Sequence, residues 1–176
     1  DSKRVTDFLN EFDRVIEKKN YNMNFVMENM GFRGLNEIGE WRGMMKKIVD
    51  KYYNETNLKG IIILGQEAWT SYLSQDRILS VPFYGCFVSE NGILIPDSIK
   101  DNDYVNWYPQ SINTCEYARK RGYSGGIMNH YNVEANVNLI RLLYPSINSI
   151  AFISDNSYGG LSLQAHVKKI MGEKYP

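Results

Sequence analysis

The sequence predicts an α/β fold, a three-layer α/β/α sandwich with a mainly parallel sheet. Segments with strand character alternate with segments of helical periodicity along most of the chain, which is typical of βαβ units. One strand candidate, Ile61–Leu64, is a continuous apolar run of the kind found in a central parallel strand covered on both faces. The 176 residues are 43% hydrophobic, which is enough for the core of one domain, or of one domain and the start of another.

The first part of the chain is predicted to form a helix, a strand and a second helix. Apolar residues recur at helical spacing from Val5 to Ile16, with charged residues on the opposite face. Residues 24–30 have the character of a strand that ends at Gly31. A second helix is expected over residues 36–53, with Asn36 as its N-cap. Its buried stripe consists of Ile38, Trp41, Met45, Ile48 and Tyr52.

The middle of the chain is predicted to hold two more strands and a short helix. The strand at 61–64 ends at Gly65, and residues 67–73 read as a short helix. The next strand, 82–88, begins with a proline, which fits the first residue of a strand because no ladder donor is needed there. The Asn91-Gly92 pair indicates a turn.

The following region is irregular before it becomes helical. Residues 96–109 are polar and aromatic, without periodicity, and are predicted to be a loop. A helix is expected over residues 114–121. Gly122, Gly125 and Gly126 then indicate a flexible break that could serve as a hinge.

The last part of the chain is predicted to be helix, strand, loop and helix. Asn132 caps the first of these helices, and Pro145 stops it because proline disfavours helix in the residue before it. Residues 149–153 are interpreted as a parallel strand, 154–160 as a polar loop and 162–171 as the final helix. A domain of this kind usually begins with a strand, so a first strand is expected to be missing or supplied by another chain or segment.

Composition excludes several classes of partner. Lysine plus arginine and aspartate plus glutamate both number 20, whereas a nucleic-acid groove needs a basic excess. The longest apolar run, 61–64, is far too short to span a bilayer, so we expect no direct membrane contact. The two cysteines, Cys86 and Cys115, have no metal-binding or redox spacing and are expected to be free thiols.

Motifs for catalysis and cofactors are absent from the sequence. It contains no GxGxxG, no GxxxxGK[ST], no GxSxG and no HExxH. His130 and His166 are the only histidines, and each is interpreted as a surface or capping residue. The sequence therefore predicts a protein that is not an enzyme and has neither a metal site nor a cofactor.

Polar side chains follow three of the predicted strands, and in open α/β sheets ligands bind beyond the carboxyl ends of the strands. These side chains predict a pocket for a small neutral or weakly charged molecule, with Trp69 and Tyr158 as stacking walls. Two alternatives remain: the polar residues only cap helices, or Glu67 and Asp155 form a pair of catalytic carboxyl groups. The predicted ligand-binding residues are Gln66, Glu67, Trp69, Cys86, Asp155, Asn156, Ser157 and Tyr158.

Three blocks of the sequence resemble a known family: LKGIIILGQEAWTSYL, VPFYGCFVSENGI and NVEANVNLIRLLYPSINSIAFISDNSYGG. They are similar to the ABC-type substrate-binding-protein-like sensor domains of bacterial hybrid two-component histidine kinases. The resemblance implies the type I periplasmic-binding fold, in which two α/β lobes are joined by crossing strands. It implies a first lobe over residues 1–126, a crossover at 127–132 and a truncated second lobe up to residue 176. Exposed apolar surface on such a truncated lobe would favour a homodimer, or docking of the final strand and helix onto the first sheet.

The resemblance implies a non-catalytic sensing domain in the periplasm, which binds a small molecule between its lobes and passes a conformational change or dimerisation to a kinase. An enzyme on a flavodoxin-like scaffold, either a hydrolase or a flavin protein, is an alternative from another class. A pure protein-interaction or dimerisation module is a third. Ligand-induced stabilisation would distinguish the first hypothesis from the third.

Overall fold

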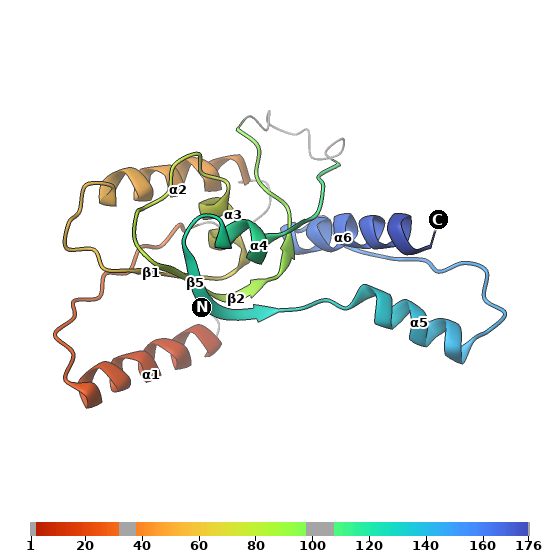
Figure 1. Ribbon diagram of the computed structural model, residues 1–176, viewed down its shortest axis with the longest axis horizontal. Helices are drawn as coiled ribbons and strands as arrows, with labels where there is room; N and C mark the ends of the chain where they lie inside the picture. Colours follow the sequence, from red (N-terminus) through yellow and green to blue (C-terminus); the bar gives the residue numbers. More distant parts are fainter. Residues whose placement is uncertain (1–2, 32–37, 98–107, 176) are drawn as a thin grey trace.

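The computed structural model describes residues 3–31, 38–97 and 108–175. These ranges form a mixed α/β structure with six helices, a three-stranded parallel sheet and a two-stranded antiparallel pair. The predicted α/β class is therefore confirmed in this general form. Figure 1 shows the sheet and most of the helices gathered around one end of the molecule, with α5 extending away from them.

The sheet consists of β1 (Ile61–Leu64), β2 (Phe83–Ser89) and β5 (Tyr123–Asn129), in the order β1-β2-β5 and parallel throughout. Two predicted strands are confirmed, those at 61–64 and 82–88. The expectation that 61–64 is an interior strand is wrong for the part of the chain that the structure describes, because β1 pairs there only with β2.

Three helices pack on one face of this sheet: α2 (Ile38–Tyr52), α3 (Gln66–Leu73) and α4 (Thr114–Arg119). Together with the sheet they enclose an apolar core in which Trp69, Leu73 and Phe83 are completely buried. Full burial of one large apolar side chain contributes roughly 1.5–3 kcal/mol, so this core is the main source of stability. Its buried members are Met45, Val49, Ile63, Trp69, Tyr72, Leu73, Leu79, Phe83, Val88 and Ala118.

The helix α1 (Lys3–Lys19) has a different position, beneath the sheet in Figure 1, whereas α2 lies above it. Its contact with the sheet includes Phe8, whose ring lies 6.0 Å from the ring of Phe87 in β2. Phe87 has a positive φ of 60° and occupies an extra position in β2, where the pairing with β5 shifts register. This β-bulge lets the Phe87 ring reach α1 while Val88 returns to the core on the other face.

The glycine-rich break predicted at residues 122–126 is wrong, because all of these residues except Gly122 belong to β5, which pairs with β2. Gly125 and Gly126 have φ values of +153° and +151°, a region that is accessible in practice only to glycine. The glycines therefore serve strand pairing, and the predicted hinge is not found here. The proposed lobe boundary at residue 126 falls inside this strand.

The strand predicted at residues 24–30 is also wrong. These residues form no ladder, and Met23, Phe25, Val26 and Met27 are exposed. An apolar sequence of this kind becomes a strand only where another strand offers free hydrogen-bonding groups. Glu28 in this segment instead binds α2, accepting hydrogen bonds from Lys51 at 2.5 Å and from Tyr52 at 2.6 Å.

The strand predicted at residues 149–153 is likewise not formed, because these residues have no strand partner in the structure. They follow α5 (Val133–Leu143), which Asn132 caps as predicted by accepting a hydrogen bond from the Ala135 amide. Both elements are poorly covered: Val137 is the buried residue of α5, and the side chain of Ile153 is 91% exposed. Figure 1 shows α5 extending away from the sheet and the segment after it turning back towards the start of α6.

The last helix, α6 (Tyr158–Lys174), begins four residues earlier than predicted and includes part of the predicted loop 154–160. Ser157 is its N-cap. It packs against β3 (Asn91–Gly92), which pairs antiparallel with β4 (Ile112–Asn113), where the sequence predicted only a turn. A second apolar cluster forms at this contact from Ile38, Trp41, Ile93, Ile95, Tyr158, Leu161 and Ala165.

Two sequence predictions fall wholly or partly outside the described residues: the Asn36 cap and most of the loop at 96–109. Among the described helices, none combines the length and apolar character needed to cross a bilayer.

Candidate functional site at the carboxyl edge of the sheet

The carboxyl ends of the three parallel strands meet at one edge, where α3 begins and α6 lies. Gln66 follows β1 after Gly65, and its side-chain Oε1 accepts a hydrogen bond of 2.5 Å from the backbone N–H of Ser89, the last residue of β2. The Glu90 amide continues the ladder by donating to the Asn129 carbonyl at 3.0 Å. This edge is the place where open α/β sheets bind ligands.

Tyr158 is a deeply buried residue of the edge, only 2% exposed. Its hydroxyl donates to the Ile93 carbonyl at 2.7 Å and accepts from the Ile93 amide at 3.2 Å. Burial raises the pKa of the Tyr158 phenol, while the nearby Ser162, Thr70 and Gln66 side chains and the Ile93 backbone oppose that shift. The hydroxyl therefore stays protonated and ties α6 to the loop after β3.

Gly92 is the point where the polar side chains converge. A Cβ at this position would lie 3.1 Å from Gln66 Nε2, 3.3 Å from Tyr158 Oη and 3.0 Å from the Thr114 methyl carbon. Thr114 in turn donates from its hydroxyl to the Ser89 carbonyl at 2.7 Å. Two of the predicted ligand-binding residues, Gln66 and Tyr158, are thus brought together, although they are far apart in the sequence.

The α6 face that meets this edge carries a polar stripe of Tyr158, Ser162 and His166, spaced one helical turn apart. All three side chains are buried. Burial is the main cause that lowers the pKa of the His166 imidazole, and the nearby Lys169 and His130 act in the same direction. The Tyr131 backbone and the Glu90 carboxylate oppose this shift. His166 is therefore neutral at physiological pH.

A hydrogen-bonded pair of side chains, His130 and Glu90, lies beside the stripe. The His130 Nδ1 donates to Glu90 Oε2 at 2.5 Å, and the Asn113 amide donates to Glu90 Oε1 at 3.0 Å. These hydrogen bonds lower the pKa of the Glu90 carboxyl, with the His130 contact as the larger cause. The pair holds the first residue after β5 against the first residue after β2.

The other predicted site residues have different surroundings. Trp69 is completely buried in the core, with its ring 5.9 Å from Phe83 and 5.4 Å from Tyr123. Cys86 is a buried free thiol within β2, and Glu67 is exposed on the first turn of α3. The two predicted aromatic walls, Trp69 and Tyr158, belong to two separate apolar clusters.

Asp155, Asn156 and Ser157 are exposed at the start of α6. The Asp155 carboxylate accepts from the Ser157 hydroxyl at 2.6 Å and from its amide at 3.1 Å, and these bonds lower the pKa of Asp155. The Ser157 hydroxyl oxygen accepts from the Gly160 amide at 3.1 Å. The contacts of Asp155 and Ser157 are those of a helix cap, the first alternative considered for these residues.

Sequence reasoning missed four residues of this edge: Glu90, His130, Ser162 and His166. Both histidines were interpreted as surface or capping residues, because the residues near them in the structure are distant in sequence. The available indication for Glu90 was its place close behind the predicted strand 82–88, whereas His130 follows β5, which the sequence did not predict. The indication for Ser162 and His166 was the repeated spacing of four residues along the helix, from Tyr158 to Ser162 and from Ser162 to His166.

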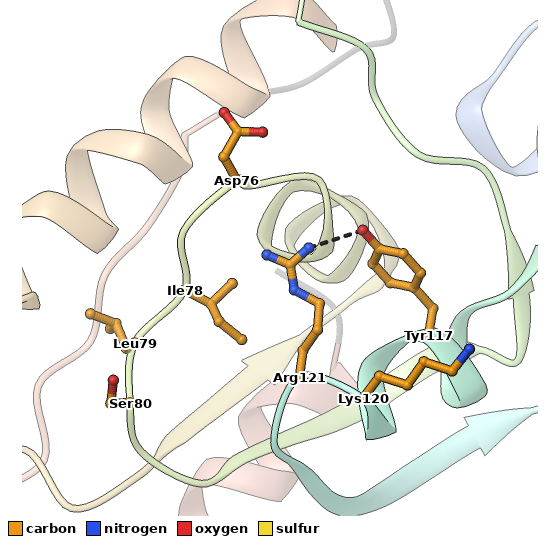
Figure 2. A pocket seen from close by; sticks show the side chains of 7 residues that line it. All are labelled: Asp76, Ile78, Leu79, Ser80, Tyr117, Lys120 and Arg121. Atoms are coloured by element: carbon orange, nitrogen blue, oxygen red, sulfur yellow. Dashed lines mark hydrogen bonds between the residues drawn. The ribbon is translucent and has the colours of Figure 1, made fainter.

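A shallow groove lies away from this edge, between α4 and the chain that leads into β2 (Figure 2). Arg121 is its central cation, donating to the Tyr117 hydroxyl at 2.9 Å and to the carbonyls of Leu73 and Gln75 at the end of α3. The guanidinium thus satisfies carbonyl groups that a helix end leaves free. Its hydrogen bonds account for Arg121 structurally, so we do not place the site here.

Metal ligands are not gathered anywhere in the ranges 3–31, 38–97 and 108–175, where no group of three or more His, Cys, Asp and Glu side chains is placed to hold an ion. Comparison of the chain with protein-family models, with curated proteins and with solved structures gave no match.

Proposed function

We propose that this chain is a non-catalytic, extracytoplasmic ligand-sensing domain of a two-component sensor kinase, and that a small molecule binds at the carboxyl edge of its parallel sheet. One observation carries the binding proposal: Gln66, Tyr158, Ser162 and His166 meet at this edge, and three of them have a buried polar atom without a hydrogen-bond partner. The sensor class and the periplasmic location rest on the three sequence blocks that resemble the family.

The finer architecture, a three-layer lobe of a type I periplasmic-binding fold, belongs to the same proposal. It is supported by the parallel order β1-β2-β5, by the helices packed on one face and by the position of α1 on the other. In such a lobe the ligand would lie at the carboxyl edge, and closure would change the surface presented to the kinase. A homodimer is part of the proposal, as the form in which the change would be transmitted.

A hydrolase is the second candidate, because the contact of 2.5 Å between His130 and Glu90 resembles the way a general base is oriented by a carboxylate. The sensing proposal is favoured because Glu90 and His130 are accounted for by linking the ends of β2 and β5. The sensing proposal also requires no nucleophilic side chain.

The first experiment is thermal unfolding of the purified chain with a panel of sugars, polyols, amino acids, amides and inorganic anions. We expect at least one compound to raise Tm in a concentration-dependent manner, because a ligand that binds only the folded state stabilises it. Absence of any stabilising compound would contradict the proposal. Hydrolysis of p-nitrophenyl acetate that is lost in His130→Gln would favour the hydrolase instead.

A further inference from the structure

We infer that the free edge of β1 binds residues 149–153 of a second copy of this chain as an added strand. The receiving surface consists of β1 and of residues 24–30, and we call it the β1 edge site. The inference rests on the homodimer of the proposed function and adds to it the surfaces through which the two copies meet.

The first argument is that β1 has the sequence of an interior strand in the position of an edge strand. All four of its residues are apolar, as in strands that lie inside a parallel sheet. In the described ranges, however, β1 pairs with β2 alone. Edge strands usually carry charged residues or proline that prevent further pairing, and β1 carries neither.

The free edge of β1 presents backbone groups to which another strand can bind. The amides of Ile61 and Gly65 donate to carbonyl groups in or next to β2. Successive amides of a strand point to opposite edges, so those of Ile62 and Leu64 face away from β2. Neither has a backbone acceptor in the part of the chain that the structure describes.

The second argument is that residues 24–30 are extended between two helices without pairing. The Phe25 ring lies 5.3 Å from that of Phe12 in α1, whereas Glu28 accepts a hydrogen bond from Tyr52 in α2. Side chains that alternate in this way are those of a strand. Among the described residues, the backbone of this segment forms no backbone hydrogen bond, so it offers a second row of free groups.

The packing of the helices places this segment on the side of the free edge of β1. Helix α3 packs on β1 and β2, α4 packs on β5, and α2 contacts α3. The helices therefore follow the order of the strands, with α2 at the β1 end. Because Glu28 is bound to α2, residues 24–30 lie at this end, and Met30 packs against the same core cluster as Ile61.

The third argument is that residues 149–153 have the properties that the β1 edge site requires. A strand added between α1 and α2 needs apolar side chains on both faces, and residues 150–153 are Ile-Ala-Phe-Ile. All of them are exposed. In the described ranges their backbone groups form no backbone hydrogen bond.

The position of this segment favours a second copy as its source. Helix α5 continues from β5, which is the edge of the sheet opposite to β1, and Figure 1 shows the chain after α5 returning towards α6. A second copy can bring its own segment to β1 without any change in its sheet. Pairing would remove exposed apolar surface from water and bind both rows of free backbone groups.

The first experiment is hydrogen exchange of the whole chain at a series of concentrations, with sedimentation velocity to measure the dimer. We expect the amides of Ile62, Leu64, residues 24–30 and residues 149–153 to become protected together as the dimer forms, because paired strands open rarely. An excess of the peptide NSIAFIS should return the chain to monomer. The same peptide carrying Ala151→Pro should not, since proline lacks the amide that a ladder needs.

The second experiment changes the inserted segment. The charge-neutral double variant Ala151→Asp with Phe152→Lys should raise the dimer dissociation constant at least about tenfold, because it places unpaired charges between two helices. Ser146→Asp with Asn148→Lys is the matched control, on exposed residues just outside the segment, and should leave the constant unchanged. Circular dichroism shows which variants remain folded.

The third experiment changes the receiving side. Val26→Pro and Met27→Pro form a matched pair, because the amides of neighbouring residues in an extended segment point to opposite sides. We expect one of the two to weaken the dimer strongly and the other to leave it nearly unchanged. Equal effects of the two substitutions would contradict strand pairing at residues 24–30.

The remaining outcomes separate this inference from the proposed function. A dimer in which the Ile62 and Leu64 amides stay unprotected would overturn the inference and leave the homodimer intact. Protection of residues 149–153 in a monomer would also overturn it, because the segment would then pair within its own copy. A chain that stays monomeric and unprotected contradicts both the inference and the homodimer, whereas the compound panel described above decides separately on ligand binding.

Discussion

Gly126 shows at the scale of one residue how closely β2 and β5 approach. A Cβ placed on Gly126 would lie 1.8 Å from the Gly85 carbonyl oxygen, which is part of the backbone and has no flexible end to move away. Its φ of +151° is also unfavourable for any residue with a side chain. The paired positions Gly85 and Gly126 are therefore required by the spacing of the two strands.

We expect Gly126→Ala to lower the free energy of unfolding by about 1–3 kcal/mol or more, because the strained φ alone has that cost and the strands must also separate. Urea denaturation followed by circular dichroism measures this change. Gly43→Ala is the control: Gly43 lies in α2 with no neighbour within 4 Å of a Cβ, so alanine should stabilise the protein by about 0.5–1 kcal/mol. Equal effects of the two substitutions would contradict the close approach of β2 and β5.

At the scale of one element, the packing of α6 against the carboxyl edge depends on the protonation of His166 and Glu90. The pKa of His166 is lowered by burial, so the unfolded chain takes up this proton more readily than the folded one. The pKa of Glu90 is lowered mainly by the His130 hydrogen bond, so the unfolded chain also protonates this carboxylate first. Both groups therefore make the folded state less stable as the pH falls.

We expect the free energy of unfolding to be highest at pH values above 6.5, the ordinary pKa of histidine. It should decrease below this pH as His166 becomes protonated in the unfolded chain. A further decrease should follow below pH 4.5, the ordinary pKa of a glutamate carboxyl, as the stabilisation from Glu90 is lost. Urea denaturation at a series of pH values measures this. His166→Asn should remove the first decrease and leave the second, and an unchanged profile in that variant would argue against His166 as its source.

The elements also show what sequence could predict. Helices α1, α2 and α5 follow from local information, namely apolar spacing and, for α5, the cap at Asn132. Residues 24–30 and 149–153 have equally clear strand character but no partner, because strand pairing depends on distant parts of the chain. The same limit applies to the site. Gln66 and Tyr158 were predicted from their place near strand ends, whereas His166 is buried only because α6 docks.

At the scale of the whole molecule, the segment from Leu139 to Ile153 exposes many apolar side chains. We call it the apolar arm; Figure 1 shows that α5 leads away from the sheet and that the chain after α5 turns back towards α6. Soluble monomers rarely expose large contiguous apolar patches, so the arm favours association. Its exposed apolar side chains are Leu139, Leu142, Leu143, Tyr144, Ile147, Ile150, Phe152 and Ile153.

We expect the chain to self-associate as its concentration increases, because contact between two arms would remove this apolar surface from water. Sedimentation velocity over a concentration series measures the association. The double variant Leu142→Glu with Ile153→Lys should shift the protein towards monomer without changing its net charge. Glu17→Lys with Lys18→Glu, on the exposed face of α1, is the charge-neutral control. A wild-type chain that is monomeric at every concentration would contradict the prediction.

The extra residue at Phe87 attaches α1 to the sheet without taking part in the pairing of β2. Cys86 and Val88 pair with the consecutive β5 residues Ile127 and Met128, so removal of Phe87 would leave these pairs in register and Val88 on the core face. What would be lost is the ring that meets Phe8 of α1. Deletion of Phe87 should therefore preserve the sheet and the contact between Ser89 and Gln66 while it releases α1, which faster hydrogen exchange confined to α1 would show.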